Sequence, residues 1–259
     1  MNGGFINSSS PNVVTIQIRI RFIITACMAC LTAATHADPV PLPKKAEDIL
    51  KIYQEMLPKT KQPDAVTRLK SSVCEVLEAE IAAESAKNKK SPVVLALLQK
   101  RLEIAPLDLV KLNANELKPE TDGVHVQPGL PLATSCLLSP PIKLKATVKA
   151  SKGNLRLLAG ADQIIFGWEI NPGELRIDGG PANGRHLAKQ GRIPTNSFFV
   201  VEQEITDKMM VVKIDGKERA KWFGDFSKIR EQAGMFAAGN SQLTVRECKV
   251  SGTATGLPE

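Results

Sequence analysis

Aromatic residues are scarce in this chain of 259 residues: they make up 4% of it, with two tryptophans and one tyrosine. Histidine occurs three times, and no Cys-x-x-C spacing is found beyond residue 37. Because protein zinc sites are built mainly from cysteine and histidine pairs at short spacing, we expect no metal centre, and no motif indicates a cofactor. The hydrophobic content of 43% and the charged content of 24% are ordinary for a globular protein.

The sequence also lacks an apolar run of the ~20 residues that a membrane-spanning helix needs. A shorter apolar stretch, residues 22–34, follows Arg19 and Arg21, has no acidic residue before it, and leads to the small-residue site Thr35-His36-Ala37. This order is typical of a secretory signal. We therefore expect residues 1–37 to be a cleaved signal peptide and the protein to be exported, periplasmic or extracellular. The lipobox-like residues 24–27 lie too close to Arg21 for a lipid-modified cysteine.

Positive charge is in mild excess and unevenly placed. Removal of the signal lowers the formal net charge from +7 to +5, and residues 123–259 hold that whole excess, with 18 basic and 13 acidic side chains. The basic residues are scattered singly rather than clustered with aromatics, which argues against nucleic-acid binding. A polyanionic glycan, an anionic lipid surface or solubility alone would each explain the excess.

Glycine is absent from residues 38–122, whereas 16 of the 18 glycines lie in 123–259. Glycine destabilises helices and favours tight turns, so this shift predicts a helical segment followed by turn-rich β structure. In the first segment, helical spacing predicts three helices, near 45–57, 66–81 and 92–105. Asp64 and Ser91 are the expected N-caps of the second and third. Cys74 follows the apolar face of the second helix and is expected to be buried.

Strict alternation of apolar and polar residues over 142–150 predicts a strand with one solvent-exposed face. Asp215-Gly216 between two such runs is a strong hairpin signal. The fold class expected is an α+β chain dominated by all-β structure: an antiparallel β-sandwich (jelly roll) over 123–259, preceded by the small helical segment 38–122. The strand candidates are residues 134–138, 142–150, 154–158, 163–170, 174–177, 198–206, 209–214, 219–222, 235–238 and 242–250.

Six stretches with a strand-like sequence pattern resemble a known fold family: residues 166–176, 191–194, 199–201, 210–216, 234–236 and 243–245. Together they resemble the concanavalin A-like lectin/glucanase jelly roll, and are similar in particular to laminin-G-like domains and to the 3-keto-disaccharide hydrolase domain of exported planctomycete-type proteins. The resemblance covers about residues 123–252. In this architecture the first and last strands are neighbours, and the resemblance therefore implies a disulfide between Cys136 and Cys248. Cys74 has no partner in this pairing.

No E-x-D-x-x-E pattern of a jelly-roll glucanase is present. Glu202 and Glu204 share one face of a predicted strand and could pair for acid-base work, but two charges at i and i+2 are more typical of a solvated face. Trp168 continues the apolar alternation and is expected in the core, whereas Trp222 ends a hairpin of alternating charge and is a candidate for exposure.

Candidate ligand-binding residues are Trp222 and four side chains in the Gly-rich connections after Trp168: Asn171, Arg176, Arg185 and His186. Loops at a sandwich edge often hold ligands, and an arginine fork suits a carboxylated or sulfated sugar. Turn formation explains Asn171-Pro172-Gly173 equally well.

Three hypotheses follow. The first is a non-catalytic exported binding protein that recognises a glycan or an envelope protein. The second is a glycoside hydrolase or lyase acting on 3-keto-type sugars, which requires Arg176, Arg185, Glu202 and Glu204 to converge on a concave face. The third is a structural envelope subunit assembled through its helices. The sequence leaves the oligomeric state open.

Overall fold

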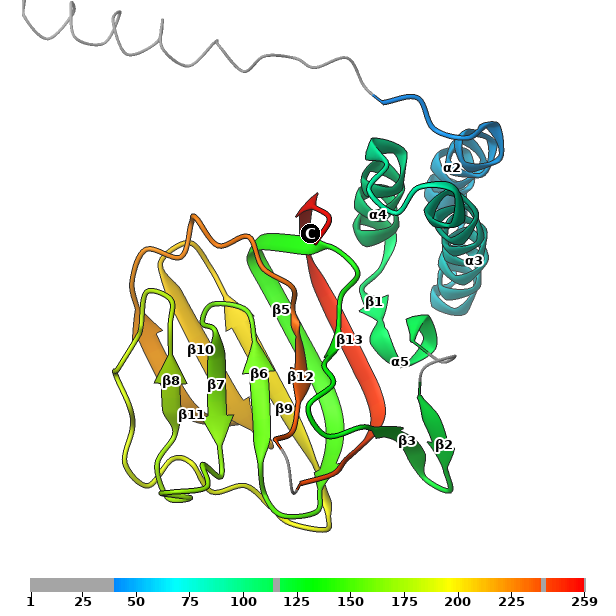
Figure 1. Ribbon diagram of the computed structural model, residues 1–259. Coiled ribbons are helices and arrows are strands. Elements are labelled where there is room, and N and C mark those ends of the chain that lie inside the picture. The colour runs from blue at the N-terminus through cyan, green and yellow to red at the C-terminus, as the bar shows by residue number, and fades with distance from the viewer. Residues whose placement is uncertain (1–39, 114–116, 239–240, 259) are drawn as a thin grey trace, which may run out of the picture. The chain divides into compact units, whose positions relative to one another are not determined.

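Two antiparallel sheets face one another in the computed structural model, which describes residues 40–113, 117–238 and 241–258 (Figure 1). The predicted signal peptide, 1–37, lies outside the described residues. Residues 40–259 form one unit. The predicted fold class, an antiparallel β-sandwich preceded by a helical segment, is confirmed. No helix among the described residues is long and apolar enough to span a membrane.

The two sheets differ in size. The large sheet has eight strands and the small sheet five. In spatial order the large sheet comprises β11 (Lys217–Phe223), β10 (Met209–Ile214), β9 (Phe198–Ile205), β5 (Leu137–Ala150), β13 (Leu243–Gly256), β3 (Gly123–Val126) and β2 (Lys118–Glu120), with β1 (Leu107–Asp108) also on β13. The small sheet comprises β4 (Leu132–Ala133), β12 (Gly234–Phe236), β6 (Leu155–Leu158), β7 (Gln163–Phe166) and β8 (Arg176–Asp178).

The hydrophobic core lies between the sheets, and the alternation along β5 shows why. Every second residue of its 142–150 stretch is buried, while the lysines between them face outward. The hairpin predicted at Asp215-Gly216 joins β10 to β11, and both residues have the positive φ, 49° and 73°, that a tight hairpin turn requires. The phenylalanines Phe166, Phe199 and Phe226 are fully buried in this core.

The three predicted helices are confirmed as α2 (Lys44–Met56), α3 (Pro63–Lys87) and α4 (Pro92–Ile104); a short 3₁₀ turn, η1 (Leu57–Lys59), and α5 (Leu109–Leu112) complete the helical part. Ser91 caps α4, its hydroxyl accepting from the Val93 N–H at 3.2 Å. Asp64 is not the N-cap of α3, because that helix already begins at Pro63.

The helices are tied to the large sheet through α4 and β13. Val94 and Leu98 belong to the core of the sandwich itself, while Cys74 is buried, as predicted, in a second apolar cluster between the helices. The Arg101 side chain is 6% exposed, and its guanidinium lies 2.7 Å from the Glu78 carboxylate. Strands β1 and β2 lie before Gly123, so the large sheet draws on the segment expected to be helical.

The expected disulfide between Cys136 and Cys248 is absent, since both residues are free and buried. Cys248 lies on β13 and Cys136 immediately precedes β5; these two strands pair, but the register places the cysteines far apart. Cys248 lies opposite Ala146, whereas Cys136 precedes Leu137, which lies opposite Gly256, eight residues further along β13. That separation is roughly 26 Å at ~3.3 Å per residue, far beyond the ~7 Å that a disulfide spans. Burial raises the pKa of both thiols to about 12.

Glu231 should make stability depend on pH. Its carboxylate accepts from the Gly160 N–H at 2.7 Å, and burial raises the pKa of the Glu231 carboxyl above the ordinary 4.5. The stability contributed by its protonated form is complete below about pH 4.5 and is lost as the pH rises through the raised folded-state pKa. Glu231→Gln keeps an acceptor for Gly160 and removes this loss.

We expect Glu231→Gln to raise Tm at pH 7 by roughly 2–4 °C, the effect of about 1 kcal/mol in a chain of this size, and to leave Tm at pH 4 unchanged. Thermal unfolding at both values measures this. The control Glu218→Gln changes an exposed carboxylate on β11 and should alter neither. An equal change of Tm in the two variants would contradict the conclusion that the buried Glu231 carboxyl makes stability depend on pH.

Candidate functional site

The outer face of the small sheet carries a row of register partners that runs across four neighbouring strands. Phe236 of β12 lies opposite Arg156 of β6, which lies opposite Ile165 of β7, which in turn lies opposite Arg176 of β8. These strands lie side by side in Figure 1. Ile165 is only 2% exposed although it faces outward, so neighbouring side chains cover it. We call this row, with Trp168, Glu169 and Asp178, the arginine–aromatic face.

Arg156 is the best-anchored side chain of the arginine–aromatic face. Its Nη1 donates to Gln163 Oε1 at 2.6 Å and its Nη2 to Glu169 Oε1 at 2.8 Å, while the guanidinium lies 5.7 Å from the centre of the Phe236 ring. The side chain is 16% exposed. Its Nε is buried and has no acceptor in the described part of the chain. Two ends of one planar group therefore fix the positions of Gln163 and Glu169.

Arg176 and Trp168 form the second half of this face. The Arg176 guanidinium lies 4.3 Å from the centre of the Trp168 ring, in cation–π geometry, and its Nε donates to both Asp178 oxygens at 2.9 Å. The hydrogen bond to Asp178 raises the pKa of Arg176, which therefore stays charged. Trp168 is half-buried, so the prediction that it lies in the core is wrong.

Gly167 explains why Trp168 leaves the core. The strand alternation stops at Phe166, because Gly167 adopts a φ of +60° and turns the chain toward the start of β6. A Cβ at this position would lie 1.9 Å from the Gly153 carbonyl oxygen. Asn154 secures the turn, its Nδ2 donating to the Gly167 carbonyl at 3.2 Å and to the Glu169 carboxylate at 3.3 Å.

The other predicted ligand residues are placed around the edge strand β8, and their contacts are local. Asn171 is exposed, and its Nδ2 donates to Glu174 Oε2 at 3.4 Å. Arg185 is exposed and donates to the Pro181 carbonyl at 2.9 Å. His186 Nδ1 accepts from the Ile177 N–H at 3.1 Å and so ties its loop to β8.

Trp222 is 3% exposed, which corrects the expectation that it could face a ligand. Its Nε1 donates to the Arg185 carbonyl at 2.9 Å. The inward side of β11 carries the indole into the core, so Trp222 supports the loop rather than contacting a solute.

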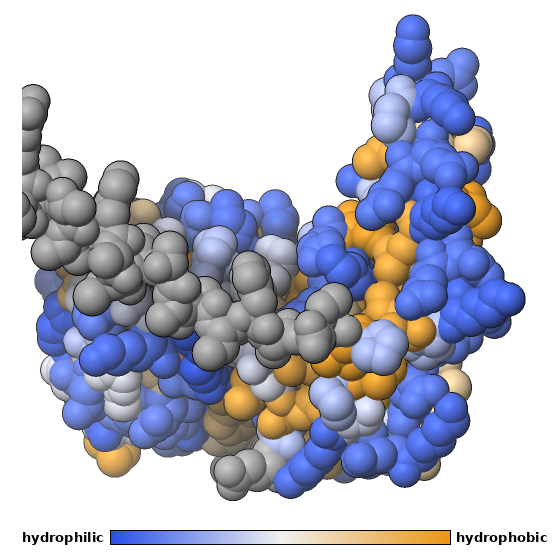
Figure 2. Space-filling model, turned by 90° about the horizontal axis from the view of Figure 1, so that it is seen from above, coloured by the Kyte–Doolittle hydropathy of each residue, from blue (hydrophilic) through white to orange (hydrophobic). Residues whose placement is uncertain are grey.

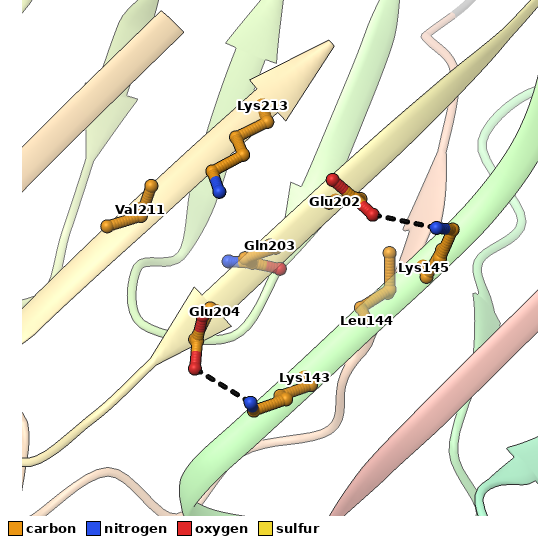
Figure 3. A pocket seen from close by; sticks show the side chains of 8 residues that line it. All are labelled: Lys143, Leu144, Lys145, Glu202, Gln203, Glu204, Val211 and Lys213. Carbon is orange, nitrogen blue, oxygen red and sulfur yellow. Dashed lines mark ion pairs between the residues drawn. The ribbon is translucent and has the colours of Figure 1, made fainter. Parts of the chain in front are cut away.

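Glu202 and Glu204 share a strand face as predicted, and that face is the outer side of the large sheet. Figure 3 shows them in a shallow groove with Lys143, Lys145 and Lys213. Lys143 Nζ lies 2.9 Å from Glu204 Oε1, and Lys145 Nζ lies 2.9 Å from Glu202 Oε1. Each carboxylate is thus paired across strands with a lysine, an arrangement that stabilises sheets.

The convergence required by the hydrolase hypothesis does not occur. Arg176 faces outward from the small sheet, whereas Glu202 and Glu204 face outward from the large sheet, so the core separates them. Among the described residues no group of three or more histidine, cysteine, aspartate or glutamate side chains is placed to hold a metal ion.

Three of the important residues were not foreseen: Asn154, Arg156 and Glu169. Asn154, just before β6, and Arg156 alternate with the buried Leu155 and Leu157, so the period-two pattern could have predicted that they share the side of the sheet opposite those leucines. Their contact with Glu169 depends on the turn at Gly167, which no pattern in the sequence specifies.

No protein-family model matches the chain, and no curated protein matches it. Solved structures match about half of it. Galectin LEC-6 of Caenorhabditis elegans has a TM-score of 0.35 and 11% identity, over 52% of this chain and 94% of that one. The carbohydrate recognition domain of Emp46p has a TM-score of 0.40 and 9% identity, over 56% and 91%. The alginate lyase AlgAT5 of polysaccharide lyase family 7 has a TM-score of 0.36 and 11% identity, over 52% and 81%.

The structural neighbours are thus lectin and carbohydrate-active jelly-roll domains at low identity. At these values they say nothing about what this chain binds. The finer resemblance, to laminin-G-like and 3-keto-disaccharide hydrolase domains of planctomycete-type proteins, stays a prediction.

Proposed function

We propose that this protein is an exported, non-catalytic glycan-binding protein whose arginine–aromatic face holds the sugar. The observation that carries the proposal is the pairing on one sheet face of Arg176 with Trp168 and of Arg156 with Phe236. The apolar C–H face of a pyranose packs on an aromatic ring, while its hydroxyls need both donors and acceptors. The arginine–aromatic face supplies aromatic rings, arginine donors and carboxylate acceptors.

The charge balance of the face favours a neutral sugar over a polyanion. Arg156 is paired with Glu169 and Arg176 with Asp178, so two positive and two negative groups compensate one another. A sulfated or uronate chain would have to compete with these carboxylates, whereas a hydroxyl can accept from an arginine and donate to its partner acid at once.

Export is supported by the sequence pattern of residues 1–37. N-terminal sequencing of the protein from an exporting host should begin at Asp38. A chain that still begins at Met1 would contradict this part of the proposal.

Trp168→Ala should weaken glycan binding roughly five- to twelvefold, since one stacked ring contributes roughly 1–1.5 kcal/mol. We would measure Kd for a panel of neutral, uronate and sulfated polysaccharides and follow release of reducing ends in the same samples. The control is Phe223→Ala, which removes an aromatic side chain that is 62% exposed on the large sheet. It should leave binding unchanged.

Equal loss in both variants, or loss only in Phe223→Ala, would place the site elsewhere. Steady release of reducing ends would replace the binding proposal by the hydrolase or lyase alternative. Binding of an envelope protein without any glycan would contradict the proposal in favour of a structural role.

A further inference from the structure

A second recess lies between the helices and the sandwich, away from the arginine–aromatic face. It has a volume of about 430 Å³. Figure 2 shows apolar side chains gathered between the polar surfaces of the helices and of the sandwich. Its lining comes from α3, the α3–α4 turn, α4, the β4–β5 connection and the C-terminal segment: Ile81, Ser85, Lys89, Lys90, Val94, Leu98, Ser135, Leu257 and Pro258. We call it the helix–sandwich groove.

The floor of the helix–sandwich groove is apolar and firmly held. Val94 and Leu98 are 3% and 2% exposed and belong to the main core, and Ile81 and Leu257 pack partly buried against them. These side chains come from three separate stretches of the chain, which the core fixes relative to one another. The groove is therefore built into the fold rather than formed by one side chain's rotamer.

The charged residues in the described lining of the groove are both basic. Lys89 and Lys90 are exposed, and neither forms an ion pair among the described residues. Among the residues that the structure describes, none of those lining the groove is acidic. The turn that carries the two lysines is fixed by Asn88, whose Oδ1 accepts from the Lys90 N–H at 3.0 Å. An apolar floor beside two uncompensated ammonium groups complements a molecule with an apolar tail and an anionic head.

We propose that the helix–sandwich groove binds a medium-chain fatty acid, with its tail along Val94, Leu98 and Leu257 and its carboxylate at Lys89 and Lys90. The volume falls in the range of small-molecule sites, ~300–1,000 Å³. Each methylene transferred from water to the floor contributes about 0.8 kcal/mol, which is about fourfold in affinity. Both chain length and head charge should therefore govern binding.

The test is titration of the purified protein with decanoate and dodecanoate below their micelle-forming concentrations and with dodecanol below its solubility limit. Dodecanoate should bind about fifteenfold more tightly than decanoate, because it buries two more methylenes, and measurably more tightly than dodecanol. The double variant Lys89→Glu/Lys90→Glu should lose the preference for the acid over the alcohol. Ser135→Trp, at an exposed lining position, should weaken both ligands.

The matched control is Lys217→Glu, a charge reversal at the tip of the β10–β11 hairpin, which should leave the preference intact. Equal affinity for dodecanoate and dodecanol, or an unchanged preference in the double variant, would overturn the proposal. So would a signal that appears only with phospholipid vesicles and not with monomeric acid. Glycan binding by the double variant should stay as in the unmodified protein, so this result and the sugar proposal are independent.

Discussion

Gly167→Ala is expected to lower the free energy of unfolding by about 3 kcal/mol and to reduce glycan binding at the same time. Two costs add. An alanine at a φ of +60° costs roughly 1–2 kcal/mol, and its methyl carbon, 1.9 Å from the Gly153 carbonyl oxygen, forces two backbone segments apart at a further cost of roughly 1–3 kcal/mol. Thermal unfolding should show a Tm lower by roughly 10 °C.

The control that isolates the clash is Gly129→Ala. Gly129 also has a positive φ, +79°, but no atom of the described residues lies within 4 Å of the position that its Cβ would take. It should show the backbone cost alone, a Tm lower by roughly 3–6 °C, with glycan affinity unchanged. Similar losses of stability in the two variants would mean that the approach of Gly167 to Gly153 is not what holds Trp168 and Glu169 in place.

Periodicity was sufficient to predict most of the fold. The alternation over 142–150 and the turn at Asp215-Gly216 each depend on a few neighbouring residues, and both appear as predicted in β5 and in the β10–β11 hairpin. The α4 boundary was equally local, because Ser91 and Pro92 meet the N-cap and first-turn requirements directly. The short strand β2, with every residue exposed, has no such pattern and was not predicted.

The site depended on information that periodicity does not carry. Arg156 meets Glu169 thirteen residues later only because the chain reverses at Gly167. The same turn ends the alternation that had placed Trp168 in the core. Strand register likewise separates Cys136 from Cys248, although β5, which follows Cys136, is the neighbour of β13, which carries Cys248.

The division of charges between the two sheets also bears on the choice between binding and catalysis. A hydrolytic site needs an acid and a second carboxylate across one scissile bond. On the large sheet Glu202 and Glu204 are each held by a lysine, and on the small sheet Glu169 and Asp178 are each held by an arginine. All four carboxylates are thus in compensated pairs, and the two on the arginine–aromatic face, Glu169 and Asp178, are the hydroxyl acceptors that the binding proposal uses.

Arg156→Lys should reduce glycan affinity tenfold or more while lowering the free energy of unfolding by only about 1 kcal/mol. A lysine ammonium cannot bridge Gln163 and Glu169 in the way the planar guanidinium does, so both acceptors lose their fixed positions. The stability cost stays small because the substitution also removes the buried Nε that has no acceptor in the described chain. Titration with the tightest-binding glycan and thermal unfolding measure the two effects separately.

Two further variants distinguish positioning of Glu169 from a general loss of structure. Glu169→Gln keeps an oxygen acceptor for Arg156 Nη2 and should retain affinity to within about threefold, since a neutral hydrogen bond replaces a charged one. Arg246→Lys changes an arginine that lies 3.7 Å from the Phe198 ring centre on the other sheet and should leave binding unchanged. If Arg246→Lys weakens binding as much as Arg156→Lys, the sugar site belongs to the large sheet. If Arg156→Lys lowers Tm without changing affinity, Arg156 supports the fold and the sugar contacts lie with Trp168 and Arg176 alone.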